Sequence, residues 1–370
     1  MTLLKFIPFT VLLFFCLPFV FAAPPHSAQQ NLAEDDQRNL FPGTGFFVKN
    51  RDPYSNEEAK SWFEEASSIQ KNGDLMGALK LYEKFTKRRS DMLLFYEGKS
   101  VLIGPESLYR AAVLRENKGD WSVAFKHLEL IAVAYPRYDF ERVTESLMRI
   151  AEKIVTEDLP KKWGFVPRFR SGSEDRARLD RIAELARGPR FAPRALMTLA
   201  DVALQEAKED DAIIALEKVV NLYPDHHACE RAYFLLASIH EGRVSGPAYD
   251  QGSTLKALNF YEDYLILFER PPAQGKYEKS FDYGLRLDGY EDRKKKALQS
   301  KREMRQILAA SKLEIGEYLE DYGKFFLIKW QELGNQPALQ FYNEAITAAP
   351  ESEAARLAEK RVAALRNKND

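Results

Sequence analysis

The sequence contains few of the residues from which active sites and covalent frameworks are usually built. It has two cysteines and five histidines in 370 residues, and Cys229 is the only cysteine after residue 22. One cysteine cannot form an intramolecular disulfide, and in an apolar stretch it is more often a packing residue than a nucleophile. The adjacent pair His226 and His227 would point apart on a helix, so it suits a metal site poorly. Phosphate-binding loops, nucleophile elbows and zinc signatures are also missing, so we expect no enzyme activity, no metal and no cofactor.

The sequence also lacks an excess of charge of either sign. It has 54 basic and 55 acidic residues, for a formal net charge of -1. A nucleic-acid-binding protein needs a basic face that displaces counterions from phosphates. The hydrophobic content of 45% is too high for a disordered chain. We therefore expect a folded protein that does not bind nucleic acid.

Long hydrophobic runs are absent except at the N-terminus, where an apolar stretch from Phe6 to Phe21 follows Lys5. This pattern is typical of an export signal, residues 1–22, cleaved after Ala22. A retained membrane anchor is the alternative, but the run is shorter than the ~20 residues that a spanning helix needs. Lipidation at Cys16 is a further alternative, which the bulky Phe15 before it disfavours.

A repeat becomes visible after a polar segment, residues 23–53, which we interpret as a flexible tether. From residue 54 to 365, apolar residues at helical spacing alternate with Gly-Asp and Tyr-Pro pairs, and their alignment gives a period of about 34 residues, that of tetratricopeptide repeats. The predicted repeats lie near 57–90, 105–138, 140–190, 193–226 and 230–270, with a final pair at 300–350 and a capping helix at 352–366. The sequence thus predicts an all-α protein, a right-handed superhelix of about five tetratricopeptide-type helix pairs.

Small residues explain how such pairs would pack. In the first helix of three predicted pairs the small residue is Ala66, Ala112 or Ala200. In the second helix of the same pairs it is Ala78, Ala124 or Ala212. Small side chains let two helices approach closely enough for their ridges to interlock. Gly73 and Gly119 are expected to adopt the left-handed conformation that ends a helix.

Two segments are longer than the repeat allows, the turn at residues 323–338 and an insertion at residues 161–170. The insertion alternates basic and aromatic residues, among them Trp163, Phe165, Arg168, Phe169 and Arg170. It is predicted to contact a membrane or a partner, since lipid headgroups favour such residues. The alternative is a hairpin that covers a neighbouring repeat, because exposed aromatic clusters are unfavourable in water.

The first helices of such a stack would line a groove for a peptide. In the first two repeats the groove-facing positions are predicted to be Lys60, Phe63, Ser67, Gln70, Tyr109, Val113 and Glu116. The alternative for the many aromatic residues of the chain is packing between helices.

Three stretches resemble one family in particular. They are Leu308–Tyr318, Asp250–Glu262 and Phe341–Ile346, and together with the export signal and the repeats they resemble the BamD family, the outer-membrane assembly lipoproteins of diderm bacteria. The resemblance implies a periplasmic scaffold, peripheral to the inner face of the outer membrane. It also implies two partners, the periplasmic domains of the β-barrel insertase and unfolded barrel substrates. The alternative is another periplasmic tetratricopeptide-repeat adaptor, for example one that coordinates cell-wall synthesis with division.

Overall fold

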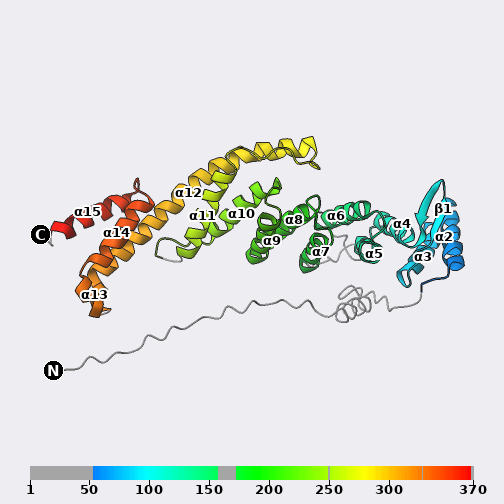
Figure 1. Ribbon diagram of the computed structural model, residues 1–370, viewed down its shortest axis with the longest axis horizontal. Helices are drawn as coiled ribbons and strands as arrows, with labels where there is room; N and C mark the ends of the chain where they lie inside the picture. The colour runs from blue at the N-terminus through cyan, green and yellow to red at the C-terminus, as the bar shows by residue number, and fades with distance from the viewer. Residues whose placement is uncertain (1–52, 157–171, 249–250, 327, 368–370) are drawn as a thin grey trace, which may run out of the picture. The chain divides into compact units, whose positions relative to one another are not determined.

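The computed structural model describes residues 53–156, 172–248, 251–326 and 328–367 (Figure 1). Several predicted features lie outside these residues. They are the export signal with Cys16, the tether up to residue 52, and the insertion from Trp163 to Arg170. The chain divides into two compact units, Met1–Gly104 and Pro105–Asp370, and each is described by itself.

Unit 1 begins with a helix pair. Its elements are α2 (Asn56–Lys71), α3 (Leu75–Tyr82), the 3-10 helix η1 (Glu83–Thr86) and the strands β1 (Leu93–Tyr96) and β2 (Lys99–Leu102). Ser55 and Glu58 form a capping box that satisfies backbone N–H groups at the start of α2. Ala66 and Ala78 are completely buried, and Gly73 has a φ of +90°, as the sequence predicts. Small residues thus place α2 directly against α3.

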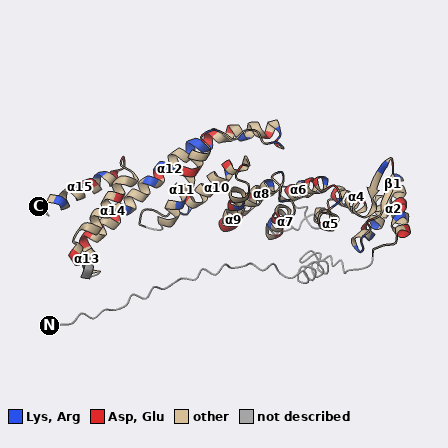
Figure 2. Cartoon of the chain, viewed as in Figure 1, with Lys and Arg blue, Asp and Glu red and all other residues tan. Residues whose placement is uncertain are grey.

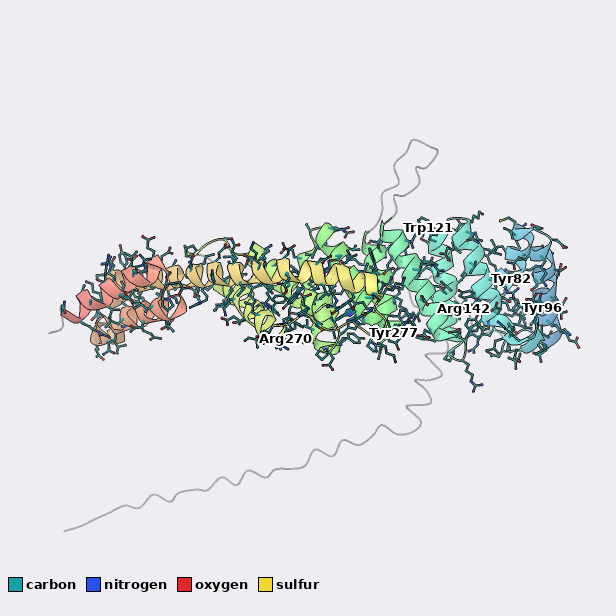
Figure 3. All side chains as sticks on the ribbon, turned by 90° about the horizontal axis from the view of Figure 1, so that it is seen from above. Tyr82, Tyr96, Trp121, Arg142, Arg270 and Tyr277 are labelled. Carbon is teal, nitrogen blue, oxygen red and sulfur yellow. The ribbon has the colours of Figure 1, made fainter. Side chains whose placement is uncertain are left out.

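The β-hairpin of unit 1 was not expected from the repeat pattern. Its strands are antiparallel, with Leu93 opposite Leu102, and its two-residue turn is Glu97-Gly98, both with positive φ. The ring of Tyr96, labelled in Figure 3, lies edge-on to that of Phe63 at 5.3 Å. The hairpin therefore covers part of α2.

Unit 2 consists of successive antiparallel helices. They are α4 (Ile103–Asn117), α5 (Trp121–Ala134), α6 (Phe140–Thr156), α7 (Gly172–Leu185), α8 (Ala192–Gln205), α9 (Glu209–Leu222), α10 (Ala228–Gly242) and α11 (Gln251–Leu267). The helices α8 and α9 pack as a pair, as do α10 and α11, and α10 also contacts α8 and α9. Ala200 and Ala212 are completely buried in the α8/α9 pair. The all-α fold of stacked helix pairs predicted from the small residues is confirmed.

The last part of unit 2 is built on one long helix, α12 (Ser280–Tyr322). It packs on α11 and then on α14 (Gln336–Ala348) and α15 (Glu353–Asn367), with η2 (Gly323–Phe325) and α13 (Ile328–Leu333) in the turn (Figure 1). The sequence predicts a loop from Pro271 to about Asp288, but α12 already begins at Ser280. Arg286, in the first turns of α12, holds this part of the helix against the preceding loop. Its guanidinium donates hydrogen bonds to Glu278 and to the carbonyl of Pro272. Within the described ranges, no helix is both long and apolar enough to cross a bilayer.

Candidate partner-binding face

The first helices of consecutive pairs in unit 2 are joined by ion pairs on one face. Arg149 of α6 donates two hydrogen bonds to the Glu116 carboxylate of α4, at 3.2 and 2.9 Å. Arg194 of α8 donates two to Glu152 of α6, at 2.6 and 2.5 Å. Each pair is bidentate, a geometry that fixes both side chains in one plane.

The series continues to the next helix. Arg231 of α10 donates hydrogen bonds of 3.2 and 2.7 Å to the Asp201 carboxylate of α8. We call the surface formed by these six side chains the first-helix face: Glu116, Arg149, Glu152, Arg194, Asp201 and Arg231. It runs across α4, α6, α8 and α10 and presents charges of both signs in a fixed order. Figure 2 shows acidic and basic residues interspersed along these helices.

The ion pairs of the first-helix face contribute little to the stability of the fold. The hydrogen bonds that Arg149 donates to Glu116 raise the pKa of the Arg149 guanidinium above its ordinary, already high value. The guanidinium therefore stays charged at any physiological pH. The Asp201 and Arg231 side chains are 35% and 44% exposed. Because water screens exposed pairs, each contributes at most about 1 kcal/mol to folding. The pairs hold charges of both signs in a fixed pattern on the surface.

The predicted groove positions of the second repeat lie on α4, and they differ in exposure. Glu116 belongs to the first-helix face, and Val113 is half-buried on the same helix. Tyr109 is buried, with its hydroxyl 3.2 Å from Ser146 Oγ and its ring centroid 3.7 Å from the Arg142 guanidinium. Tyr109 therefore joins α4 to α6 beneath the charges.

The predicted groove positions of the first repeat lie in unit 1. Lys60 is exposed and lies 3.9 Å from Glu64. Gln70 accepts a 2.9 Å hydrogen bond from the hydroxyl of Tyr82. Phe63 and Ser67 are buried, since Phe63 packs on Tyr82 and Ser67 Oγ lies 3.3 Å from the Tyr82 hydroxyl. These two side chains are not available to a partner, and partner contact by the other predicted positions stays a prediction.

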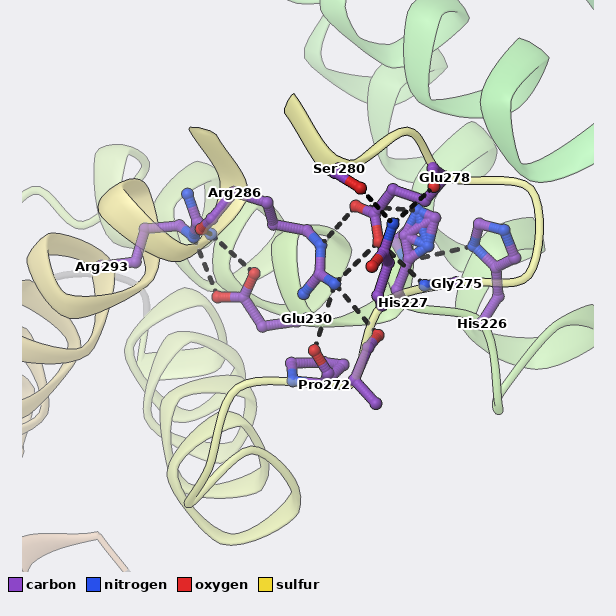
Figure 4. A network of polar contacts seen from close by, with 12 residues as sticks. His226, His227, Glu230, Pro272, Gly275, Glu278, Ser280, Arg286 and Arg293 are labelled. Atoms are coloured by element: carbon purple, nitrogen blue, oxygen red, sulfur yellow. Dashed lines mark hydrogen bonds and ion pairs between the residues drawn. The ribbon is translucent and has the colours of Figure 1, made fainter. Parts of the chain in front are cut away.

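A second polar cluster joins the start of α10 to the start of α12 (Figure 4). Glu230 is completely buried and accepts hydrogen bonds of 2.9 and 2.7 Å from Arg293 and one of 2.7 Å from the Tyr264 hydroxyl. Arg286 is bonded to Glu278, and His227 Nε2 lies 3.7 Å from the same carboxylate. These contacts fasten the loop before α12 onto α10.

The histidine pair, which the sequence alone makes a poor metal site, belongs to this cluster. Both rings are half-buried, and burial, followed by the neighbouring His227, lowers the pKa of His226 to about 4. Sequence reasoning missed the cluster because Glu278 and Arg286 lie more than fifty residues downstream. Among the residues that the structure describes, no group of His, Cys, Asp and Glu side chains is placed to hold a metal ion.

Cys229 is a packing residue, as predicted. Its thiol is 1% exposed and donates a hydrogen bond of 2.9 Å to the carbonyl of Tyr223. Burial raises the pKa of the thiol to about 11. A nucleophilic cysteine has a lowered pKa, so the shift here is in the opposite direction.

The α8/α9 pair is similar to a known family. Residues 194–226 match the model of the tetratricopeptide repeat. The α8/α9 pair is therefore a tetratricopeptide repeat. This matched repeat holds Arg194 and Asp201, and therefore the centre of the first-helix face.

Some solved structures are more distantly similar to this chain. A crystal structure of MamA is 18% identical and covers 55% of this chain and 94% of its own, with a TM-score of 0.27. MamA from residue 41 to its end, from Desulfovibrio magneticus RS-1, is 14% identical and covers 58% and 98%, with a TM-score of 0.28. No curated protein matches the sequence.

Proposed function

We propose that this tetratricopeptide-repeat protein is an exported, non-catalytic scaffold that holds partner proteins on its first-helix face during assembly of outer-membrane β-barrels. The observation that supports binding at this face is the unbroken series of bidentate ion pairs from Glu116 to Arg231. Side chains that are already fixed lose little conformational entropy when a partner binds. A fixed pattern of both signs also selects a partner with the complementary pattern.

The sequence supports the proposed cellular location and the proposed partners. The apolar N-terminal run favours export, and the resemblance of Leu308–Tyr318, Asp250–Glu262 and Phe341–Ile346 to the BamD family favours the inner face of the outer membrane. The proposed partners are accordingly the periplasmic domains of the β-barrel insertase and unfolded barrel substrates. The scaffold is proposed to lie in the periplasm, peripheral to the membrane.

The test is affinity purification from detergent-solubilised membranes, with a variant that alters only the charge pattern. Asp201→Arg combined with Arg231→Asp keeps an ion pair at the same place and inverts its direction. Like charges brought together at an interface cost several kcal/mol, so we expect at least tenfold less insertase to be recovered with this variant. The matched control is the inversion of Asp180 and Lys218, a pair of similar exposure and a 2.8 Å contact that joins α7 to α9.

Recovery of the insertase with the wild type and with the control inversion, but not with the first-helix inversion, would support the proposal. Recovery of peptidoglycan synthesis or division enzymes without the insertase would instead favour the adaptor that coordinates cell-wall synthesis. Equal recovery with both inversions would contradict binding at the first-helix face.

A further inference from the structure

The enlarged turn between α12 and α14 carries an exposed aromatic cluster. Tyr318 and Tyr322 lie one helical turn apart near the end of α12, and Phe325 and Phe326 follow in and after η2. The exposed fractions of these four side chains are 54%, 52%, 72% and 50%. The Tyr318 ring lies 5.2 Å from that of Tyr322 and 5.6 Å from that of Phe326. We call these four side chains the turn cluster.

Packing of the repeat does not account for the turn cluster. The same helix directs Ala309, Leu313 and Gly316 toward α14, and all three are buried. Gly316 allows the closest approach, because a Cβ at this position would lie 2.6 Å from Cε1 of Tyr342. The contact between α12 and α14 is therefore made by other residues. The four aromatic side chains, each at least half exposed, belong to the turn that closes this helical hairpin (Figure 1). Contiguous exposed apolar side chains of this kind mark interaction surfaces.

The chemistry of the turn cluster fits a lipid surface. Tyrosine and phenylalanine beside lysine are favoured where a bilayer meets water, and the Lys324 ammonium lies 5.1 Å from the Phe325 ring centroid. Of the nearby acids, Glu317 and Glu320 lie 3.6 and 3.9 Å from Arg361, and Asp321 is exposed.

We infer that the turn cluster inserts its aromatic rings into the headgroup region of a phospholipid bilayer and holds this end of unit 2 on the membrane surface. The occupant is lipid and not a protein, because the cluster lies at the end of a hairpin and combines aromatic rings with a lysine. Interfacial anchoring works through buried apolar area with added attraction from basic residues. The inference does not depend on which proteins occupy the first-helix face.

Vesicle co-sedimentation tests this inference. The chain is expressed from Ala23, so that the apolar run before it does not itself bind lipid. It is mixed with vesicles of phosphatidylcholine alone and with vesicles containing phosphatidylglycerol. The variant Phe325→Ser/Phe326→Ser removes the two phenylalanine rings. Its matched control is Ile266→Ser/Leu267→Ser, which removes an adjacent pair with similar exposures of 75% and 58% at the end of α11.

We expect the wild type and the control to sediment with both kinds of vesicle and the phenylalanine variant to bind at least tenfold more weakly, because burial of one phenylalanine side chain already corresponds to about that factor. Circular dichroism establishes that each variant is folded. Three results would overturn the inference. They are a wild type that binds neither kind of vesicle, a phenylalanine variant that binds like the wild type, and an equal loss in the control.

Discussion

The buried pair of Glu230 and Arg293 provides the sharpest test of how α12 is held on α10. Glu230 is completely buried and Arg293 is 18% exposed, and their contact is bidentate. In Arg293→Met the stem of the side chain is kept, but Glu230 retains only the hydroxyl of Tyr264. A buried charge left without its partner destabilises a protein by about 3–5 kcal/mol. We therefore expect a loss of this size in the free energy of opening of α10.

The matched control is Arg231, the residue that follows Glu230 on α10. Arg231 also makes a bidentate ion pair, with Asp201, but both of these side chains are more than a third exposed. Arg231→Met should cost about 1 kcal/mol or less, since water screens the pair. Replacing both buried partners, as Glu230→Met with Arg293→Met, should restore part of the stability because no unpaired charge remains.

Native-state hydrogen exchange of the α10 amides measures all three variants with the same probes, because Glu230 and Arg231 are both on α10. Equal losses for Arg293→Met and Arg231→Met would refute the reasoning. So would a double variant that is less stable than Arg293→Met alone.

Three further predictions concern other parts of the structure. Gly316→Ala should destabilise the α12/α14 contact by about 1–3 kcal/mol in urea unfolding, because the added methyl group meets the Tyr342 ring, whereas Gly284→Ala on the same helix meets nothing within 4 Å and should not destabilise. Cys229 should react with a thiol reagent at pH 8 only after unfolding, because its pKa is raised to about 11 and it is buried; reaction at the rate of a free thiol would contradict this. The pKa of His226 is lowered to about 4 against about 6.5 in an unfolded chain, so the unfolded state binds more protons between these pH values and stability falls as the pH falls through this window. His226→Gln should reduce that fall by about 3 kcal/mol in unfolding measured from pH 7 to pH 4, and an unchanged pH dependence would argue against a neutral His226 in the fold.

The helix pairs were predictable because their signals are local. Ala200, Ala212 and Gly119 each report a constraint on the chain within a few residues, and the structure places each as expected. The hairpin from Leu93 to Leu102 was missed because its apolar residues had no place in the repeat pattern. The early start of α12 was missed because it depends on contacts of Arg286 with Glu278 and Pro272, which a reading of helical periodicity does not contain.

The first-helix face shows a different limit. The sequence separations of its three ion pairs are 33, 42 and 30 residues. A fixed period of about 34 residues therefore aligns only the first pair, because the connections between the helices differ in length. Glu116 was found from the period, whereas Arg194, Asp201 and Arg231 required the packed helices. Phe63 and Ser67 were assigned to the groove by the same period and are buried, since their side chains face Tyr82.

Site-specific photo-crosslinking in intact cells tests partner binding at the first-helix face most directly. A photoreactive residue replaces Thr198, which is on α8 between Arg194 and Asp201, and in a matched variant it replaces Glu217, which is exposed on α9. If partners bind as proposed, the variant at residue 198 forms a crosslink to the β-barrel insertase and the variant at residue 217 does not. Crosslinks of equal yield at both positions, or a crosslink at residue 217 alone, would contradict partner binding at this face.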